Sequence, residues 1–480
     1  MLDPSKEGTP TNGPSRKRII IVGAGLGGTM MAVMLAKSGH KIDIYERRED
    51  PRSGLGKEGR SINLTLATRG LNVLKEAGLY DKVIANTVPL EGRMIHSLDG
   101  RIDYQPYGNN RHQVIHSIMR DDISLILTEC ADALENVTMH FNMRCVSIDK
   151  DAASARFQHE KKQETIEANG DLIIGSDGAY STVLYQMHHK ERISLSKQYF
   201  DWGYKELTIP AKPDGSPQLL MNGFHMWPRK DCLVLVMSNL NGSFTCSVCL
   251  PFEGELSFES IKTKEQVAEF FKERFPKITP LIPNIEERFL ERKPVQMMTL
   301  KLGPWYYKDK MVVLGDACHA IVPFYGQGMN ITFEDCSCLS RLMVEYPDDL
   351  ETAFEKYQQQ RKPQTDAMAD LSVGNFSILQ NQVHLRYFNA YRKVEMILNR
   401  LAPKLWIPLY TLVAHTTLPV TQAVNRFKRQ QRILRWTGGT LIMGGLALIV
   451  MAWDWLSAFV LPPKHNPYAP LKPEESPKVP

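Results

Sequence analysis

A group of glycines near the start of the chain has the spacing of a phosphate-binding turn. Gly23, Gly25 and Gly28 form the pattern G-x-G-x-x-G, with Gly27 inside it, directly after the apolar run 18–22. The first glycine permits a tight turn, the second lets a pyrophosphate approach the backbone, and the third lets the next helix pack on the strand. Free N–H groups at the start of that helix attract phosphates. The pattern therefore predicts a dinucleotide-binding turn.

An acidic residue completes this pattern. Residues 29–38 are predicted to form a helix that Gly39 ends, and residues 41–45 alternate as a second strand. Glu46 follows that strand, where a carboxylate can accept hydrogen bonds from a ribose diol. Glycines alone could form only a turn, but here strand, helix, second strand and acidic residue occur in the order that dinucleotide binding requires.

Two aspartates follow other apolar runs. Asp177 lies in an Asp-Gly turn after residues 171–176, and Asp316 lies in a Gly-Asp turn after residues 311–315. At the carboxyl ends of parallel strands, both carboxylates could accept hydrogen bonds from sugar or ribityl hydroxyls. Either could instead belong to an ordinary turn. Their occurrence together with the glycine pattern favours a cofactor site.

These three motifs, in this order, resemble those of the single-component FAD-dependent aromatic hydroxylases. The resemblance covers about residues 18–460, and the usual Arg that ends the middle motif is Leu184 here. It implies an α/β fold: a Rossmann-like FAD-binding domain, an inserted antiparallel β-sheet substrate domain, a C-terminal helical layer and a C-terminal membrane anchor. The candidate FAD-binding residues are Gly23, Gly25, Gly27, Gly28, Tyr45, Glu46, Arg47, Arg48, Thr65, Arg120, Cys145, Asp177, Asp316, Met329 and Asn330. At Thr65 and Cys145 only backbone contacts are expected.

The resemblance also implies a substrate and a reaction. The expected reaction is hydroxylation of L-kynurenine to 3-hydroxy-L-kynurenine, in tryptophan degradation towards NAD, with NADPH and O₂ as co-substrates and a flavin C4a-hydroperoxide as oxidant. Arg93, Tyr107, Asn375 and Tyr410 match the substrate-contacting positions. Arg93 would hold the substrate carboxylate through a bidentate guanidinium. No catalytic side chain is expected because the flavin carries the chemistry, and His319 is interpreted as structural.

Other functions remain open from the sequence. An FAD monooxygenase or reductase of this fold could act on a lipid, and a protein of this fold could bind a partner without flavin chemistry. An apolar substrate would not need Arg93 beside a tyrosine, and the retained Gly-Asp motif argues against a non-flavin protein. A net charge of +5 is too small to indicate nucleic-acid binding. Cys246 and Cys249 lack a second, similarly spaced pair, so reduced thiols are predicted and no metal site.

The C-terminal region contains a hydrophobic segment with a basic flank. Residues 436–453 carry no charge and could form a helix of roughly 27 Å, close to the hydrocarbon thickness of a bilayer. The basic residues before it are Arg426, Lys428, Arg429, Arg432 and Arg435. The positive-inside rule would place them, and the catalytic body, in the cytosol. The resemblance further implies the mitochondrial outer membrane.

The motifs and composition together predict the domain organisation. It comprises a disordered lead-in over residues 1–17, a discontinuous FAD-binding domain over 18–190 and 300–345, a β-sheet substrate domain over 191–299 plus about 91–110, a helical region over 346–430, a transmembrane anchor over 436–461 and a disordered tail over 462–480.

Overall fold

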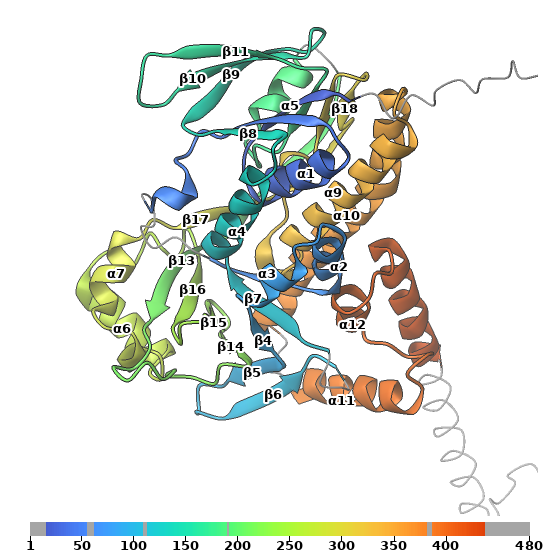
Figure 1. The fold of residues 1–480 in the computed structure, drawn as a ribbon. Coiled ribbons are helices and arrows are strands. Elements are labelled where there is room, and N and C mark those ends of the chain that lie inside the picture. Colours follow the sequence, from blue (N-terminus) through green and yellow to red (C-terminus); the bar gives the residue numbers. More distant parts are fainter. Residues whose placement is uncertain (1–15, 55–61, 109–112, 190–191, 382–385, 437–480) are drawn as a thin grey trace, which may run out of the picture. The chain divides into compact units, whose positions relative to one another are not determined.

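The computed structural model describes residues 16–54, 62–108, 113–189, 192–381 and 386–436 (Figure 1). The chain divides into two compact units, residues 1–424 and 425–480, and the first contains all the elements described below. The predicted tail, nearly all of the predicted lead-in and, apart from Trp436, the predicted membrane anchor lie outside the described residues. Within the described residues, no helix is long and apolar enough to cross a membrane.

A six-stranded sheet forms around the predicted dinucleotide turn (Figure 1). Its strand order is β18 (Tyr306–Tyr307), β19 (Met311–Val313), β12 (Leu172–Gly175), β1 (Arg18–Val22), β2 (Lys41–Tyr45) and β8 (Val137–His140). All neighbouring strands are parallel except β18 and β19. Strands β12 and β19 are buried throughout, as expected for a parallel sheet covered on both faces. The predicted α/β fold is confirmed here.

Three helices pack beside this sheet. Helix α1 (Leu26–Lys37) contacts α4 (Arg120–Asp132) and α9 (Gly328–Glu345). The prediction that the first helix begins at residue 29 was wrong: α1 begins at Leu26, inside the glycine motif. Glycines have low helix propensity, so the sequence pattern places the start too late. The earlier start brings the N-terminal end of the helix to the turn.

A seven-stranded sheet forms the second half of the body (Figure 1). Its order is β17 (Val295–Gly303), β13 (Ser194–Ile209), β16 (Phe244–Pro251), β15 (Leu233–Ser238), β14 (Gly223–Pro228), β5 (Gly92–His96) and β6 (Ile102–Pro106). Four of these strands, β13 to β16, lie within the range 191–299, for which a β-sheet domain was predicted. Strand β17 crosses the predicted boundary at residue 300. One face of the sheet packs on a core completed by α6 (Lys264–Arg274) and α7 (Ile285–Glu291).

The remaining elements connect the two sheets. A small sheet contains β3 (Asn63–Leu66), β7 (Ile115–Met119) and β4 (Val88–Leu90), and β3 leads into α2 (Thr68–Glu76). The C-terminal helices of the body are α10 (Leu350–Asn381), α11 (Arg386–Leu401) and α12 (Leu409–Ala414). Helix α10 packs along α9 (Figure 1). These three helices lie within the range 346–430, for which a helical region was predicted.

Candidate active site

A cavity of about 520 Å³ opens at the carboxyl ends of four parallel strands and continues along one face of the seven-stranded sheet. The segments after β1, β2, β12 and β19 all contribute to its wall, including Gly23, Glu46, Asp177 and Asp316. The carboxyl edge of a parallel sheet is where α/β proteins bind nucleotides. Gly23 and Asp316, which are more than 290 positions apart in the chain, therefore reach the same cavity because β1 and β19 lie on either side of β12 in the sheet.

The glycine turn presents backbone to this cavity. Gly23 has a φ of 101°, and a Cβ there would lie 2.5 Å from the Ser176 carbonyl oxygen, so only glycine fits. A Cβ on Gly25 would have no atom within 4 Å, which means that this position faces open space. Gly25 precedes α1 and provides no side-chain cap. The first N–H groups of α1 are thus available to a phosphate.

Glu46 lies directly after β2 at the cavity, the position expected for a carboxylate that binds a ribose. Its two carboxylate oxygens accept hydrogen bonds from the backbone N–H groups of Ala24 (2.8 Å) and Arg48 (2.9 Å). Each oxygen keeps a second lone pair, and the residue lines the cavity. The bond from Ala24 ties the end of β2 to the glycine turn, and the bond from Arg48 fixes the other oxygen, so the carboxylate is held in place before any ligand arrives.

Three arginines give the cavity a cationic rim. Arg47, Arg48 and Arg120 line it and are exposed, and within the described part of the chain none of them forms an ion pair. Arg120 is the first residue of α4. Unpaired guanidinium groups at a nucleotide-sized cavity match the charge of a pyrophosphate.

The two predicted aspartates differ in what they contact. Asp316 is exposed to the cavity, and its carboxylate has no hydrogen-bond partner among the described residues. Asp177 also lines the cavity, but its oxygens accept hydrogen bonds from Ser181 Oγ, Thr182 N (2.6 Å) and Val183 N (3.1 Å). Burial raises the pKa of Asp177, against these hydrogen bonds, which lower it. Asp177 therefore satisfies the first two backbone N–H groups of helix α5 (Thr182–Met187), whose N-cap is Ser181, and Asp316 is the available acceptor.

Three predicted contacts lie behind the cavity wall. Gly28 does not line the cavity, and a Cβ there would lie 1.9 Å from the Gly23 carbonyl oxygen. Asn330 is fully buried; its side chain accepts from Ala67 N (2.9 Å) and donates to the Thr65 carbonyl oxygen (2.8 Å). Asn375 donates to the Phe324 carbonyl oxygen at 2.7 Å, and Phe324 lines the cavity. The ligand contacts predicted for Gly28, Asn330 and Asn375 stay predictions. In the structure these residues contact other residues of the cavity wall, namely Gly23, Thr65 and Phe324.

The other candidate cofactor residues do line the cavity: Gly27, Tyr45, Thr65, Cys145 and Met329. The Thr65 hydroxyl donates to the Gly326 carbonyl oxygen at 2.8 Å, and the Thr65 carbonyl oxygen accepts from Asn330, so the backbone contact expected at Thr65 stays a prediction. Burial raises the pKa of the Cys145 thiol to about 12, so it is neutral.

At the far end of the cavity lies a buried arginine. The Arg93 side chain comes from β5, is 6% exposed, and its Nε has no hydrogen-bond partner. Within the described ranges no acidic side chain pairs with it. Its guanidinium carbon lies 4.8 Å from the Tyr410 ring centroid and 5.6 Å from that of Tyr107. Tyr325 stacks beside Tyr410 at 5.6 Å. A buried cation that lacks an anion is a binding site for one.

The sequence did not identify the apolar wall between these two ends. Alternate residues of three strands line it: Phe224, Met226, Leu235, Met237, Ser247 and Cys249. Their neighbours, such as Val234, Val236 and Cys246, pack in the core on the opposite face. The sequence offered only the alternation of side chains along each strand. Because both faces of the sheet are apolar here, this alternation could not predict which face borders a cavity. Cys246 and Cys249 lie on opposite faces of β16, since they are three residues apart.

The residues present fit FAD. Backbone at Gly25 open to the cavity, the cationic rim and the unpartnered Asp316 suit a pyrophosphate and a ribityl chain. The apolar strand face beyond them suits a flat ring system. His319 does not line the cavity; its Nε2 contacts Asp335 in the interior.

Comparison with known proteins agrees with this geometry. The sequence profile of the FAD binding domain family matches residues 16–372. The chain is 41% identical over 437 residues to a kynurenine 3-monooxygenase of Salinispora tropica, covering 91% of this chain and 95% of that protein. It is 37% identical over 430 residues to a kynurenine 3-monooxygenase of Dictyostelium discoideum, covering 87% and 92%.

Solved structures share the fold at lower identity. A tetrameric form of 2-methyl-3-hydroxypyridine-5-carboxylic acid oxygenase is 20% identical, with a TM-score of 0.62 over 77% of this chain and 94% of that chain. P. aeruginosa PqsL in complex with 2-aminobenzoylacetate is 19% identical, with a TM-score of 0.62 over 79% of this chain and all of that chain.

Proposed function

Since the chain belongs to the kynurenine 3-monooxygenase family, we propose that it hydroxylates L-kynurenine at carbon 3. Kynurenine, NADPH, a proton and O₂ would give 3-hydroxykynurenine, NADP⁺ and water. Bound FAD would supply the redox chemistry, which is transfer of a hydride from NADPH and activation of O₂. The chain's own residues bind and orient the substrate and exclude water.

One observation carries this proposal: Arg93 is buried, with no acidic partner among the residues that the structure describes, in the same cavity as the nucleotide-binding strand ends. The substrate carboxylate would supply the missing anion through two charge-assisted hydrogen bonds. Tyr107 and Tyr410 flank the guanidinium and exclude water from the pair. The aminophenyl ketone would then extend along the apolar wall of Phe224, Met226 and Leu235. The ring amino group activates the carbon beside it, so the reaction requires no strong base.

The test compares substrates that differ only at the carboxylate end. NADPH oxidation by the FAD-loaded protein is measured with L-kynurenine, with 2-aminoacetophenone, which keeps the aminophenyl ketone but lacks the amino acid, and without substrate. We expect strong stimulation by L-kynurenine and formation of the hydroxylated product by mass spectrometry. Equal stimulation by 2-aminoacetophenone would show that Arg93 does not select a carboxylate.

The lipid and binding-protein alternatives predict different results. A lipid-modifying flavoenzyme would leave Arg93 buried and unpaired in its complex, which is unfavourable. A binding protein without flavin chemistry would not need Asp316 free at the cavity. A purified protein without a flavin absorption spectrum would contradict our proposal and support the binding protein.

For location, we propose that residues 436–461 anchor the protein in the mitochondrial outer membrane with the catalytic body in the cytosol. This proposal rests on the uncharged run, its basic flank and the resemblance noted above. A chain truncated after Arg435 should appear in the soluble fraction with FAD bound, whereas the full chain should pellet with membranes. A truncated chain that still pellets would require a second membrane contact, and the apolar segment 405–413 would be tested first.

A further inference from the structure

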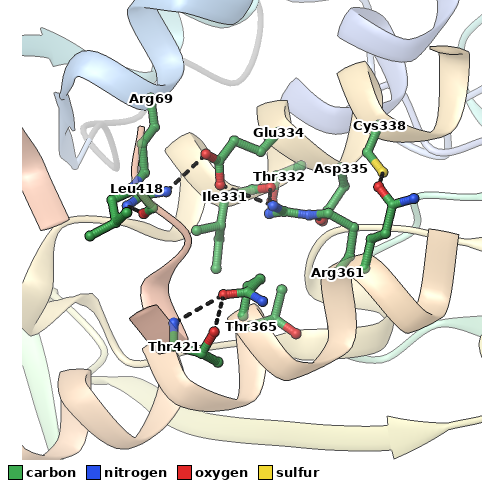
Figure 2. A network of polar contacts seen from close by, with 12 residues as sticks. Arg69, Ile331, Thr332, Glu334, Asp335, Cys338, Arg361, Thr365, Leu418 and Thr421 are labelled. Atoms are coloured by element: carbon green, nitrogen blue, oxygen red, sulfur yellow. Dashed lines mark hydrogen bonds and ion pairs between the residues drawn. The ribbon is translucent and has the colours of Figure 1, made fainter. Parts of the chain in front are cut away.

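A chain of buried charges connects α2 with the segment that contains α12 (Figure 2). The Arg69 side chain, from α2, is 1% exposed, and its Nη1 pairs with Glu334 Oε1 at 3.0 Å. Its Nε donates to the Val413 carbonyl oxygen at 2.9 Å, and its Nη2 donates to the Leu418 carbonyl oxygen. One guanidinium thus holds two carbonyls on either side of the turn that follows α12.

A second buried arginine fixes the acidic partner of the first. Arg361, from α10, pairs with the other Glu334 oxygen at 3.1 Å and with Asp335 Oδ1 at 2.7 Å (Figure 2). It also donates to the Ile331 carbonyl oxygen at 3.0 Å. The remaining Asp335 oxygen contacts His319 Nε2. Glu334 is therefore held at both oxygens, and Arg69 binds to a fixed support on α9 and α10.

The segment that Arg69 holds carries one wall of the carboxylate site. Helix α12 is only six residues long, and a helix of that length depends on tertiary contacts for its position. Its Tyr410 ring lies 4.8 Å from the Arg93 guanidinium carbon, and the Thr411 hydroxyl lies 3.4 Å from the Tyr107 carbonyl oxygen, which accepts its hydrogen bond. A shift of α12 would therefore uncover Arg93.

We propose that Arg69 is a positioning residue for the substrate carboxylate site: by holding the Val413 and Leu418 carbonyls, it keeps Tyr410 over Arg93. Arg69 does not line the cavity, so its effect on substrate binding passes through α12. The proposal rests on the proposed kynurenine site for its choice of ligand. It adds a residue that neither the motifs nor the cavity wall indicates.

The proposal is tested with the Arg69→Lys variant. Arg69→Gln is prepared as well, so that the same measurements can be made if one of the two variants does not fold. Lysine keeps the charge beside Glu334, but its single ammonium lacks the planar fork that reaches both carbonyls. We expect FAD content within 10% of the parent protein, kcat within about twofold, and a KM for L-kynurenine raised at least fivefold. Unchanged KM in a folded, FAD-loaded variant would overturn the proposal.

A double-variant cycle identifies the route of the effect. In a Tyr410→Leu background, Arg69→Lys should change KM by less than twofold, because the ring that Arg69 positions has already been removed. The same fivefold increase in both backgrounds would show that the effect does not pass through Tyr410, and the proposal would be wrong.

A matched buried cation controls for general destabilisation. Lys205 is 6% exposed, donates to the Phe289 carbonyl oxygen at 2.9 Å and lies against the core on the other side of the sheet. Lys205→Ala would remove the donor to the Phe289 carbonyl oxygen and leave a cavity in this core, so it should lower thermal stability and leave KM unchanged; an equal rise in KM would count against a specific role for Arg69. Wild-type protein without kynurenine-dependent NADPH oxidation would instead refute the proposed function, independently of the variants.

Discussion

Replacing Arg93 by methionine should weaken substrate binding strongly without lowering the stability of the substrate-free protein. The Arg93 charge is buried, and no acidic side chain of the described chain compensates it. Burying such a charge is unfavourable by several kcal/mol, while the contacts with the Tyr107 and Tyr410 rings return about 0.5–2 kcal/mol each. These contributions nearly cancel, so we expect the melting temperature of Arg93→Met to equal or exceed that of the parent protein.

The complex should respond very differently. A buried, bidentate charge pair loses about 2–5 kcal/mol when one partner is removed. At about 1.4 kcal/mol per factor of ten, that is roughly 30-fold to several thousand-fold in affinity. The KM for L-kynurenine should rise at least 30-fold while FAD stays bound, because Arg93 lies at the end of the cavity away from the glycine turn.

Arg361 supplies the matched control. It is also buried, but Asp335 and Glu334 compensate its charge. Burial opposes ionisation of Asp335, yet His319 and Arg361 lower its pKa, so Arg361→Met would leave a buried carboxylate without one of its two partners. That change should destabilise by about 3–5 kcal/mol. At about 2.1 cal/mol/K of unfolding entropy per residue, the melting temperature should fall by roughly 3–6 °C.

The assay measures melting by scanning fluorimetry of the FAD-loaded, substrate-free proteins, and KM by NADPH oxidation. If Arg93→Met melted as far below the parent as Arg361→Met does, Arg93 would be a structural residue and our reasoning would fail. If its KM were unchanged, the carboxylate would bind elsewhere, and a lipid substrate would gain support.

Three further changes test other parts of the cavity. Asp316→Ala should fold but purify with little FAD, because it removes a carboxylate whose hydrogen bonds to FAD would contribute about 1.5–3 kcal/mol, or ten- to hundredfold in affinity. Full flavin occupancy would contradict the assignment of Asp316 as an FAD-binding residue. Gly28→Ala should destabilise the fold because its Cβ would lie 1.9 Å from a carbonyl oxygen, whereas Gly25→Ala should fold and lose FAD affinity; equal stability of the two would show that α1 can move. At pH 8, a thiol reagent should modify one cysteine of the native protein, Cys130, because the other seven are buried and burial raises the pKa of Cys145, Cys232 and Cys249 to about 12. Their reactivity should increase only as the pH approaches that value, and rapid modification of several at pH 8 would refute this.

The dinucleotide half of the site could be predicted because its determinants are local. A strand, a turn and an acidic residue lie within 30 positions, and each restricts the backbone in a way that residue type reveals. Asp177 and Asp316 were found for the same reason, as turn residues directly after buried strands. Even here the sequence could not separate their roles, because the hydrogen bonds from Thr182 and Val183 to Asp177 depend on the course of the following helix.

The substrate half could not be found from local pattern. Arg93 stands in the strand Gly92–His96, where a charged residue between apolar ones is more typical of a solvent-facing position. It is buried because Tyr107 and Tyr410 cover it, and Tyr410 lies more than 300 residues later in the chain. Only the resemblance to known hydroxylases indicated Arg93, and the burial and missing anion now give an independent physical reason.

Arg69 and Arg93 show why burial alone does not identify function. Both are arginines of the first hundred residues, both are almost fully buried, and neither looks buried in the sequence. Glu334 compensates the charge of Arg69, and backbone carbonyl oxygens accept from its N–H groups. These contacts offset the cost of burying the guanidinium without any ligand. Arg93 has rings around it but no anionic side chain from the described parts of the chain, so its burial becomes favourable only when a ligand brings an anion. The difference lies in what surrounds each guanidinium, and decisive parts of those surroundings, Glu334 for Arg69 and Tyr410 for Arg93, lie hundreds of residues away in the chain. A buried arginine with an acidic partner therefore indicates a structural role, and a buried arginine without one indicates a binding site for an anionic ligand.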